Sequence, residues 1–126
     1  MSILPNAKER QFMKAVMDFH NSYGVGYLYG DEWHFKPLQC HHVAGRTYKQ
    51  NKIHIGHYFI LPVPVFLHDV HSPHPLNVTH WRNSFTATFG MQRDLWESMV
   101  SRMHSQGTID ELPPIDVILS IAKTKY

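Results

Sequence analysis

The sequence predicts an α+β fold, in which a pair of short β-strands precedes a helix and further helices flank both ends of the chain. Apolar residues recur at helical spacing near both termini, whereas two central segments, residues 38–43 and 56–63, have the character of strands. A chain of 126 residues, 43% hydrophobic and 17% charged, is typical of a globular protein. We therefore expect one domain, residues 1–126.

The first element is an amphipathic helix over about residues 7–20. Asn6 and Glu9 have the spacing of a capping box, in which each side chain bonds the backbone N–H of the other residue. The apolar row of this helix is Phe12, Val16 and Phe19. In the next segment, residues 27–35, aromatic residues alternate with glycine and acids. Either a short strand with a turn or a loop that packs its aromatics on the core fits this pattern.

The strand pair follows. Residues 38–43 are predicted as a short strand that carries two adjacent histidines, and residues 56–63 as a second strand rich in aromatic and β-branched residues. The polar, basic segment 44–55 between them is expected to be a long connecting loop. Pro62 and Pro64 either end the second strand or place it at a sheet edge, because proline cannot donate a backbone hydrogen bond.

Helical spacing returns at about residue 78, with Asn77 or Thr79 as the N-cap. The buried stripe expected for this helix is Trp81, Phe85 and Phe89. A further helix is predicted from about residue 92, and a short apolar helix over residues 115–123. The apolar rows of the helix from residue 92 are Leu95, Met99 and Met103, with Trp96 and Val100 beside them.

The composition narrows the class of protein. The single cysteine, Cys40, excludes an intrachain disulfide and a cysteine-rich zinc framework. Residues 1–6 lack a basic segment followed by an apolar run, and the apolar stretch 58–67 is too short to span a bilayer. A net charge of +2 is compatible with a polyanionic partner but is far weaker than the basic surface of a typical DNA-binding protein. We expect a cytoplasmic protein without a membrane partner.

The main chemical signal is the distribution of histidine. The chain has eleven histidines, and most of them fall between positions 41 and 80. Imidazole is the commonest neutral metal ligand and the usual base near neutral pH. The histidines in this stretch are His41, His42, His54, His57, His68, His71, His74 and His80. Their crowding predicts a metal site.

The order of elements favours a particular kind of metal site. A strand with a histidine pair, a second strand, a loop and then a helix beginning near a histidine is the order of the ββα-metal (HNH-type) nuclease motif. Such a site needs one divalent ion with about three protein ligands and an open position for a phosphate oxygen. It also needs an unligated imidazole that takes a proton from water. Adjacent strand residues point to opposite faces, so His41 and His42 need a twist or bulge, which Gly45 allows.

The same segments resemble a known family. Residues 40–42 (Cys-His-His), a strand ending in Leu-Pro, His68, residues 78–80 (Val-Thr-His) and a helix ending in Phe89-Gly90 are similar to the phage Ref-like (recombination-enhancement) nucleases, which are related to HNH enzymes. The resemblance covers about residues 38–100, which is half of the chain. It implies a small ββα-metal core within the α+β fold.

The resemblance also implies roles for individual histidines. His41 corresponds to the first metal ligand, His42 to the general base, and His68 and His80 to the remaining ligands. Family members often have a cysteine and a histidine pair after the second strand, where this chain has Phe66 and the isolated His68. Two further histidines therefore stay open as substitutes for His68. These are His71 and His74.

Two other positions stay open as well. Asn77 and Asn83 are the candidates for the central asparagine of the motif. His54 and His57 flank the second strand, where they are placed to support the ligands. A mostly imidazole ligand set suits one Zn²⁺, Ni²⁺ or Mn²⁺ ion better than Mg²⁺, which prefers oxygen.

The expected function is a metal-dependent DNA endonuclease or nickase in phage recombination or DNA processing, acting in the cytoplasm of a bacterial host. Its partners are DNA and, in recombination, a recombinase filament. Arg46, Lys49 and Lys52 lie between the predicted strands, where they are placed to contact the DNA backbone, although a solvated loop has the same composition. The alternative is a non-catalytic zinc-stabilised module that binds DNA or protein, and a third option is a histidine-rich protein without metal.

Overall fold

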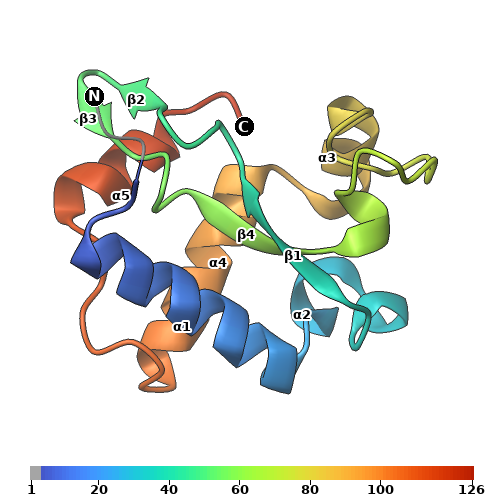
Figure 1. Ribbon diagram of the computed structural model, residues 1–126, viewed down its shortest axis with the longest axis horizontal. Coiled ribbons are helices and arrows are strands. Elements are labelled where there is room, and N and C mark those ends of the chain that lie inside the picture. The colour runs from blue at the N-terminus through green and yellow to red at the C-terminus, as the bar shows by residue number, and fades with distance from the viewer. Residues whose placement is uncertain (1–3) are drawn as a thin grey trace.

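The computed structural model describes residues 4–126 and confirms the predicted α+β composition (Figure 1). The N-terminal part contains α1 (Ala7–Tyr23), α2 (Gly26–Tyr29) and the 3₁₀ turn η1 (Asp31–Trp33). The strands are β1 (Leu38–His42), β2 (Lys49–Gln50), β3 (Ile53–His54) and β4 (Ile60–Pro64). They are followed by the 3₁₀ turn η2 (Val65–Leu67), α3 (Arg82–Phe89), α4 (Gln92–Ser105) and α5 (Ile115–Ala122).

The central sheet is the antiparallel pair β1–β4, whose register places His41 opposite Leu61. Cys40 lies opposite Pro62, and Leu38 lies opposite Pro64. These two pairs alternate with the hydrogen-bonded pairs of the ladder, so neither proline faces a backbone carbonyl that needs its missing N–H. Both alternatives given for the prolines fit the structure. Pro64 is the last residue of β4, and β4 is an edge strand because the sheet has two strands within residues 4–126.

Helices α1 and α4 both contact β4, and all five residues of that strand are buried (Figure 1). Between them lies the main core, in which Trp96 of α4 packs against the rings of Phe12 and Phe59. The indole Nε1–H of Trp96 donates to the carbonyl of Tyr58 at 2.7 Å, so the one polar atom of this side chain has a buried partner. This packing holds β4, and through it β1, in a fixed position.

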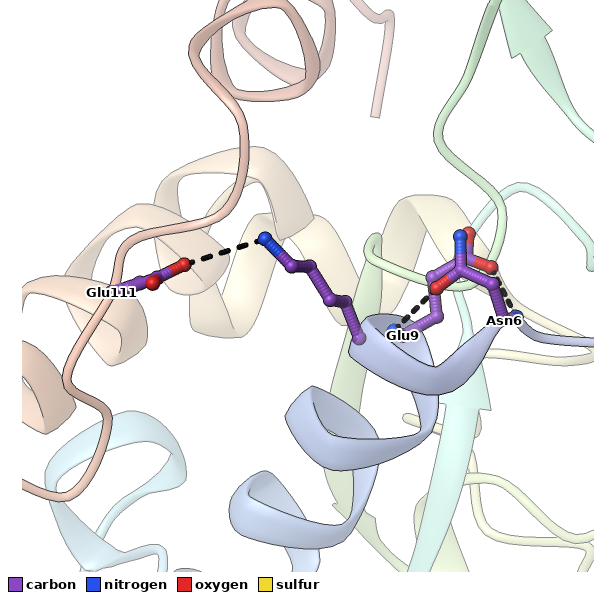
Figure 2. A network of polar contacts seen from close by, with 4 residues as sticks. Asn6, Glu9 and Glu111 are labelled. Atoms are coloured by element: carbon purple, nitrogen blue, oxygen red, sulfur yellow. Dashed lines mark hydrogen bonds and ion pairs between the residues drawn. The ribbon is translucent and has the colours of Figure 1, made fainter.

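The predicted capping box of α1 is confirmed. The Asn6 side chain accepts a hydrogen bond from the backbone N–H of Glu9, and the Glu9 carboxylate accepts one from the backbone N–H of Asn6, both at 2.8 Å (Figure 2). Glu111, also shown there, forms an exposed ion pair with Lys8 at 3.7 Å. The helix ends at Tyr23, three residues beyond the predicted end.

Two predicted loops contain regular structure. Residues 27–35 form neither a strand nor an irregular loop, because α2 and η1 occupy most of the segment and meet at Gly30, whose φ is 104°. The expected packing of aromatics on the core is found for Tyr29 and Trp33, which are buried. The connection 44–55 contains the β2–β3 hairpin, which contacts α5. Its two turn residues, Asn51 and Lys52, have φ values of 51° and 69°, the conformation of a tight type I′ hairpin turn. Such turns usually have glycine at the second position, so Lys52 did not indicate one in the sequence.

The boundaries of the second predicted strand and of the helix after it also differ from the prediction. The second strand begins at Ile60 rather than at residue 56, because residues 56–59 form a turn. Helix α3 begins at Arg82, and its N-cap position is Trp81, which makes no side-chain capping bond. Trp81 is 46% exposed and therefore does not belong to the buried stripe. Phe85 is buried and Phe89 is partly buried, and both pack against Tyr29 of α2.

The C-terminal helices follow the prediction closely. All five residues of the predicted apolar rows of α4 are buried. Helix α5 ends at Ala122, one residue before the predicted end. Within residues 4–126, no helix combines the length and apolar character needed to cross a membrane. The expectation of no secretory signal concerned residues 1–6, of which residues 1–3 lie outside the described part.

The buried side chain of His20 in α1 makes the stability of the fold depend on pH. It is 1% exposed, with Nδ1 at 2.6 Å from the Val16 carbonyl and Nε2 at 2.6 Å from the Tyr27 hydroxyl. Burial lowers the pKa of His20 from 6.5 to about 4, against a smaller opposing effect of the Val16 carbonyl. As the pH falls from 6.5 towards 4, the unfolded chain binds a proton that the folded chain does not bind, so stability is lost over this range.

Between pH 7.5 and pH 5 we expect His20 to lower the free energy of unfolding by about 2 kcal/mol. Urea unfolding of the wild type and of His20→Gln at both pH values measures this difference. His104→Gln, at an exposed position of α4, is the control and should keep the wild-type pH dependence. Equal pH dependence in wild type and His20→Gln would show that His20 is not the group responsible.

Candidate metal and catalytic site

Four histidines of the crowded stretch lie near the end of β1 in two pairs. His41 lies against His68, with ring centroids 4.8 Å apart and ring planes at 61°. His42 lies against His57, with centroids 5.4 Å apart and the His57 Nδ1 at 3.3 Å from the His42 Nε2. Adjacent residues of a strand point to opposite faces, and this alternation separates the two pairs. The structure thus brings His41 and His68 together and gives His42 a different neighbour.

Each imidazole of the first pair is held by a glutamine. Nε2 of His41 donates to Oε1 of Gln92 at 2.8 Å, and Nδ1 of His68 donates to Oε1 of Gln39 at 2.6 Å. Gln92 is the first residue of α4 and is 1% exposed, so its side chain reaches the strand from within the core. These bonds leave one nitrogen of each ring, Nδ1 of His41 and Nε2 of His68, to act as an electron-pair donor.

The surroundings keep these imidazoles neutral. Burial, with help from the adjacent His68, lowers the pKa of His41 to about 4. Burial, with His57 and Arg46, lowers the pKa of His42 to about 4, and burial also lowers the pKa of His68. Metal ligation and general-base catalysis both require a neutral ring with a free lone pair. At pH 7 the three histidines have that form.

The segment after β4 is organised by Asn77, one of the two candidates for the central asparagine. This side chain is fully buried, and its amide donates to the Asp69 carbonyl at 2.9 Å. Its Oδ1 accepts from the backbone N–H groups of Thr79 and His80 at 2.9 and 3.2 Å. Asn83, the other candidate, is exposed in α3. Asn77 therefore ties residues 66–72 to the start of the helix, which fixes the position of His68.

His80, the third predicted ligand, has a different orientation. Its backbone adjoins Thr79, whose hydroxyl donates to the His68 carbonyl, but its ring Nε2 bonds the Val70 carbonyl at 2.7 Å. The ring is exposed beside Trp81, at the edge of a hollow of about 350 Å³. The backbone of His80 thus lies close to that of His68, but its ring does not contact the His41–His68 pair.

The alternatives to His68 lie elsewhere. His71 is exposed and lines the same hollow as His80. His74 packs its ring edge-on against Trp33, and its Nδ1 accepts from the backbone N–H of Leu76 at 3.1 Å. Of the three histidines considered for this ligand position, His68 is the one whose ring faces His41. His54 is exposed in β3, whereas His57 supports His42.

The predicted DNA-binding residues are all exposed, but they do not lie in one loop. Arg46 follows β1 and is close enough to His42 to lower its pKa. The backbone carbonyl of Arg46 would lie 2.1 Å from a Cβ at position 56, so Gly56 allows the segment after β1 to pass this close to the turn before β4. Lys49 and Lys52 belong to the β2–β3 hairpin.

The side chains at this site supply some, but not all, of the ligands that a metal ion needs. Across residues 4–126, no three side chains among His, Cys, Asp and Glu converge on one point as they would around an ion. His41 and His68 nevertheless supply two neutral imidazole donors side by side, which is ligand chemistry suited to Zn²⁺, Ni²⁺ or Mn²⁺. Cys40 precedes His41 on β1, so its side chain points to the opposite face of the strand, and burial raises the pKa of its thiol to about 11.

The sequence did not single out the residues that orient these imidazoles. Gln39 lies two residues before His41, which is the spacing of one strand face, and Asp69 follows His68 directly. That spacing was a usable signal for Gln39. The position of Gln92, 51 residues from His41, depends on how α4 packs against the sheet.

Comparisons with family models, curated proteins and solved structures give no match, so the chemistry of the site rests on its own geometry.

Proposed function

We propose that this protein is a metal-dependent DNA endonuclease or nickase of the HNH type. The observation that carries the proposal is the facing pair His41–His68 beside the neutral His42 at the end of β1. The elements β1, β4 and α3 follow one another in the order expected of a strand–strand–helix nuclease core. A role in phage recombination or DNA processing, with a recombinase filament as partner, rests on the resemblance to the Ref-like family alone.

In this proposal His41 and His68 hold one divalent ion, which would polarise the scissile phosphate and stabilise the leaving oxygen. Gln92 and Gln39 keep the two rings oriented. His42 is the general base. Its Nε2 faces His57, so we assign the proton from the attacking water to its Nδ1.

His80 is the third ligand in this proposal. The bond from its ring to the Val70 carbonyl is solvent-exposed, and a solvent-exposed bond of this kind contributes only about 1 kcal/mol. Ligation by a metal ion is stronger than that, so turning the ring away from Val70 is energetically accessible. Thr79 and Asn77 already hold its backbone next to His68.

Metal analysis combined with cleavage assays tests the proposal. The purified protein is loaded separately with Zn²⁺, Ni²⁺, Mn²⁺ and Mg²⁺ and incubated with supercoiled plasmid and with single-stranded DNA. We expect about one ion per chain, nicking or linearisation with the ions that imidazole prefers, and loss of cleavage on chelation. A tightly held ion with no cleavage of either substrate would support the alternative, a zinc-stabilised binding module.

The exposed basic residues give a further prediction. Replacing Arg46, Lys49 and Lys52, which are exposed, with alanine should weaken DNA binding to all sequences alike, because contacts to phosphates carry no sequence information. Each lost contact should reduce the slope of log affinity against log salt by roughly one unit. Fluorescence anisotropy over a range of salt concentrations measures both.

Single variants separate the contributions of these three residues. Arg46 lies beside His42, so Arg46→Ala should have the largest effect, and Lys123→Ala, exposed at the end of α5, is the matched control. An unchanged affinity and salt slope in the triple variant would show that the segment is only a solvated surface.

A further inference from the structure

Next to His68 the structure contains a chain of two hydrogen bonds that ends in a carboxylate. Oε1 of Gln39 lies 2.6 Å from Nδ1 of His68, and Nε2 of the same amide lies 3.1 Å from Oδ2 of Asp69. The other carboxylate oxygen of Asp69 accepts from the backbone N–H of His71 at 2.9 Å. Gln39 thus lies between a carboxylate and an imidazole, with one end of its amide facing each.

The carboxylate decides which way the amide points. An ionised carboxylate only accepts hydrogen bonds, so the NH₂ group of Gln39 has to face Asp69. The carbonyl oxygen of the amide then faces His68, and because this oxygen also only accepts, Nδ1 of His68 has to carry a proton. A neutral imidazole has a single N–H, so Nε2 of His68 is left with its lone pair.

This arrangement has a direct consequence for metal binding. A ring whose tautomer is already set presents its lone pair without first moving a proton, and it does not have to search for an orientation. The sheet makes the arrangement possible, because Gln39 and His41 lie two residues apart on β1 and share a face. Strand β1 therefore supplies both the ligand His41 and the residue that orients the other ligand, Gln39 beside His68.

We propose that Asp69 and Gln39 form a positioning relay that holds His68 as its Nδ1–H tautomer and directs Nε2 towards the ion. The direction towards an ion rests on the proposed function, whereas the tautomer is a property of the metal-free protein. Asp69 and Gln39 are positioning residues, since they act on the site through His68. The same relay explains why a half-buried strand position carries a glutamine.

Nitrogen-15 NMR of the metal-free protein at pH 8 tests the relay, since the shifts of the two ring nitrogens distinguish the tautomers. In the wild type we expect His68 as the Nδ1–H form. Gln39→Met keeps the length of the side chain but removes the acceptor, so the Nε2–H form should appear. Gln50→Met, at a half-buried glutamine of β2 outside the site, should leave His68 unchanged.

Exchanging the amide and the carboxylate between positions 39 and 69 distinguishes an effect on the tautomer of His68 from an effect on packing. In the double variant Gln39→Glu with Asp69→Asn, the carboxylate at position 39 accepts from His68 and the amide at position 69 donates to it, so the Nδ1–H form should return. Asp69→Asn alone keeps an acceptor for the His71 N–H but no longer fixes the amide of Gln39, so a mixture of tautomers is expected. An Nε2–H form in the wild type, or identical tautomers in all variants, would overturn the proposal.

Metal affinity gives a second readout that does not require cleavage. Titration with Co²⁺, followed by its absorption spectrum, should show affinity about ten- to hundredfold lower in Gln39→Met and largely restored in the double variant. If Gln39→Met changes the tautomer and lowers the Co²⁺ affinity but the wild type cuts no DNA, the proposed nuclease function fails and the relay stands. If DNA is cut while the tautomer and the Co²⁺ affinity do not respond to Gln39→Met, the relay fails and the nuclease function stands.

Discussion

His42→Ala is expected to abolish DNA cleavage while the metal content stays near one ion per chain. A general base contributes roughly a hundredfold to ten-thousandfold to the rate of a hydrolytic step, and alanine cannot take a proton from water. His42 is neutral at pH 7, and its ring pairs with His57 rather than with His41 and His68. Plasmid nicking rates and elemental analysis of the same preparation measure the two quantities.

His54→Ala is the matched control for this variant. His54 lies in the β2–β3 hairpin and is exposed. Its removal should leave both cleavage and metal content unchanged. If His42→Ala lost metal and activity in equal measure, His42 would be a ligand and the roles of His41 and His42 would have to be exchanged.

His68→Ala is expected to remove metal binding and cleavage together. The ring of His68 faces His41 and is the second imidazole of the proposed site, so its loss leaves one protein donor from this pair. The reduction in affinity should exceed the ten- to hundredfold loss that is typical when a group outside the ligand set is changed. Isothermal titration with Zn²⁺ and Mn²⁺ measures this loss.

Two further variants determine the rest of the ligand set. His71→Ala should bind metal like the wild type, because in the proposed ligand set the imidazole that faces His41 is that of His68. His80→Ala should lower metal affinity and also the melting temperature of the loaded protein, since a ligand couples binding to folding. An unchanged metal content and melting temperature in His80→Ala would remove His80 from the site, and normal binding by His68→Ala would remove the proposed pair.

The elements that the sequence predicted well depend on short-range signals. The Asn6–Glu9 capping box fixes the start of α1, and the apolar rows of α4 appear at the expected spacing. A cap or a helical stripe involves residues within three or four positions of each other, so the sequence contains the whole signal. The strand that carries His41 and His42 was predicted to within one residue for the same reason.

Where the prediction failed, a distant contact decided the conformation. The stripe of α3 was expected to begin at Trp81, but the helix packs its Phe85 and Phe89 on Tyr29, and Trp81 stays half exposed outside the helix. The connection between the strands was expected to be an open loop, but β2 and β3 pair within it and contact α5. Neither contact has a signature in the local pattern of residues.

Some features of the site likewise follow from the sequence, and others follow only from the tertiary structure. The sequence by itself determined which histidines are crowded together and the order of strands and helix around them. Only the tertiary structure decided that His41 faces His68 while His42 faces His57, because strand alternation and the path of the segment after β4 act together. The orienting bonds join residues 51 and 29 positions apart, His41 to Gln92 and His68 to Gln39. Such bonds form only when packing of the helices on the sheet has brought distant side chains within reach.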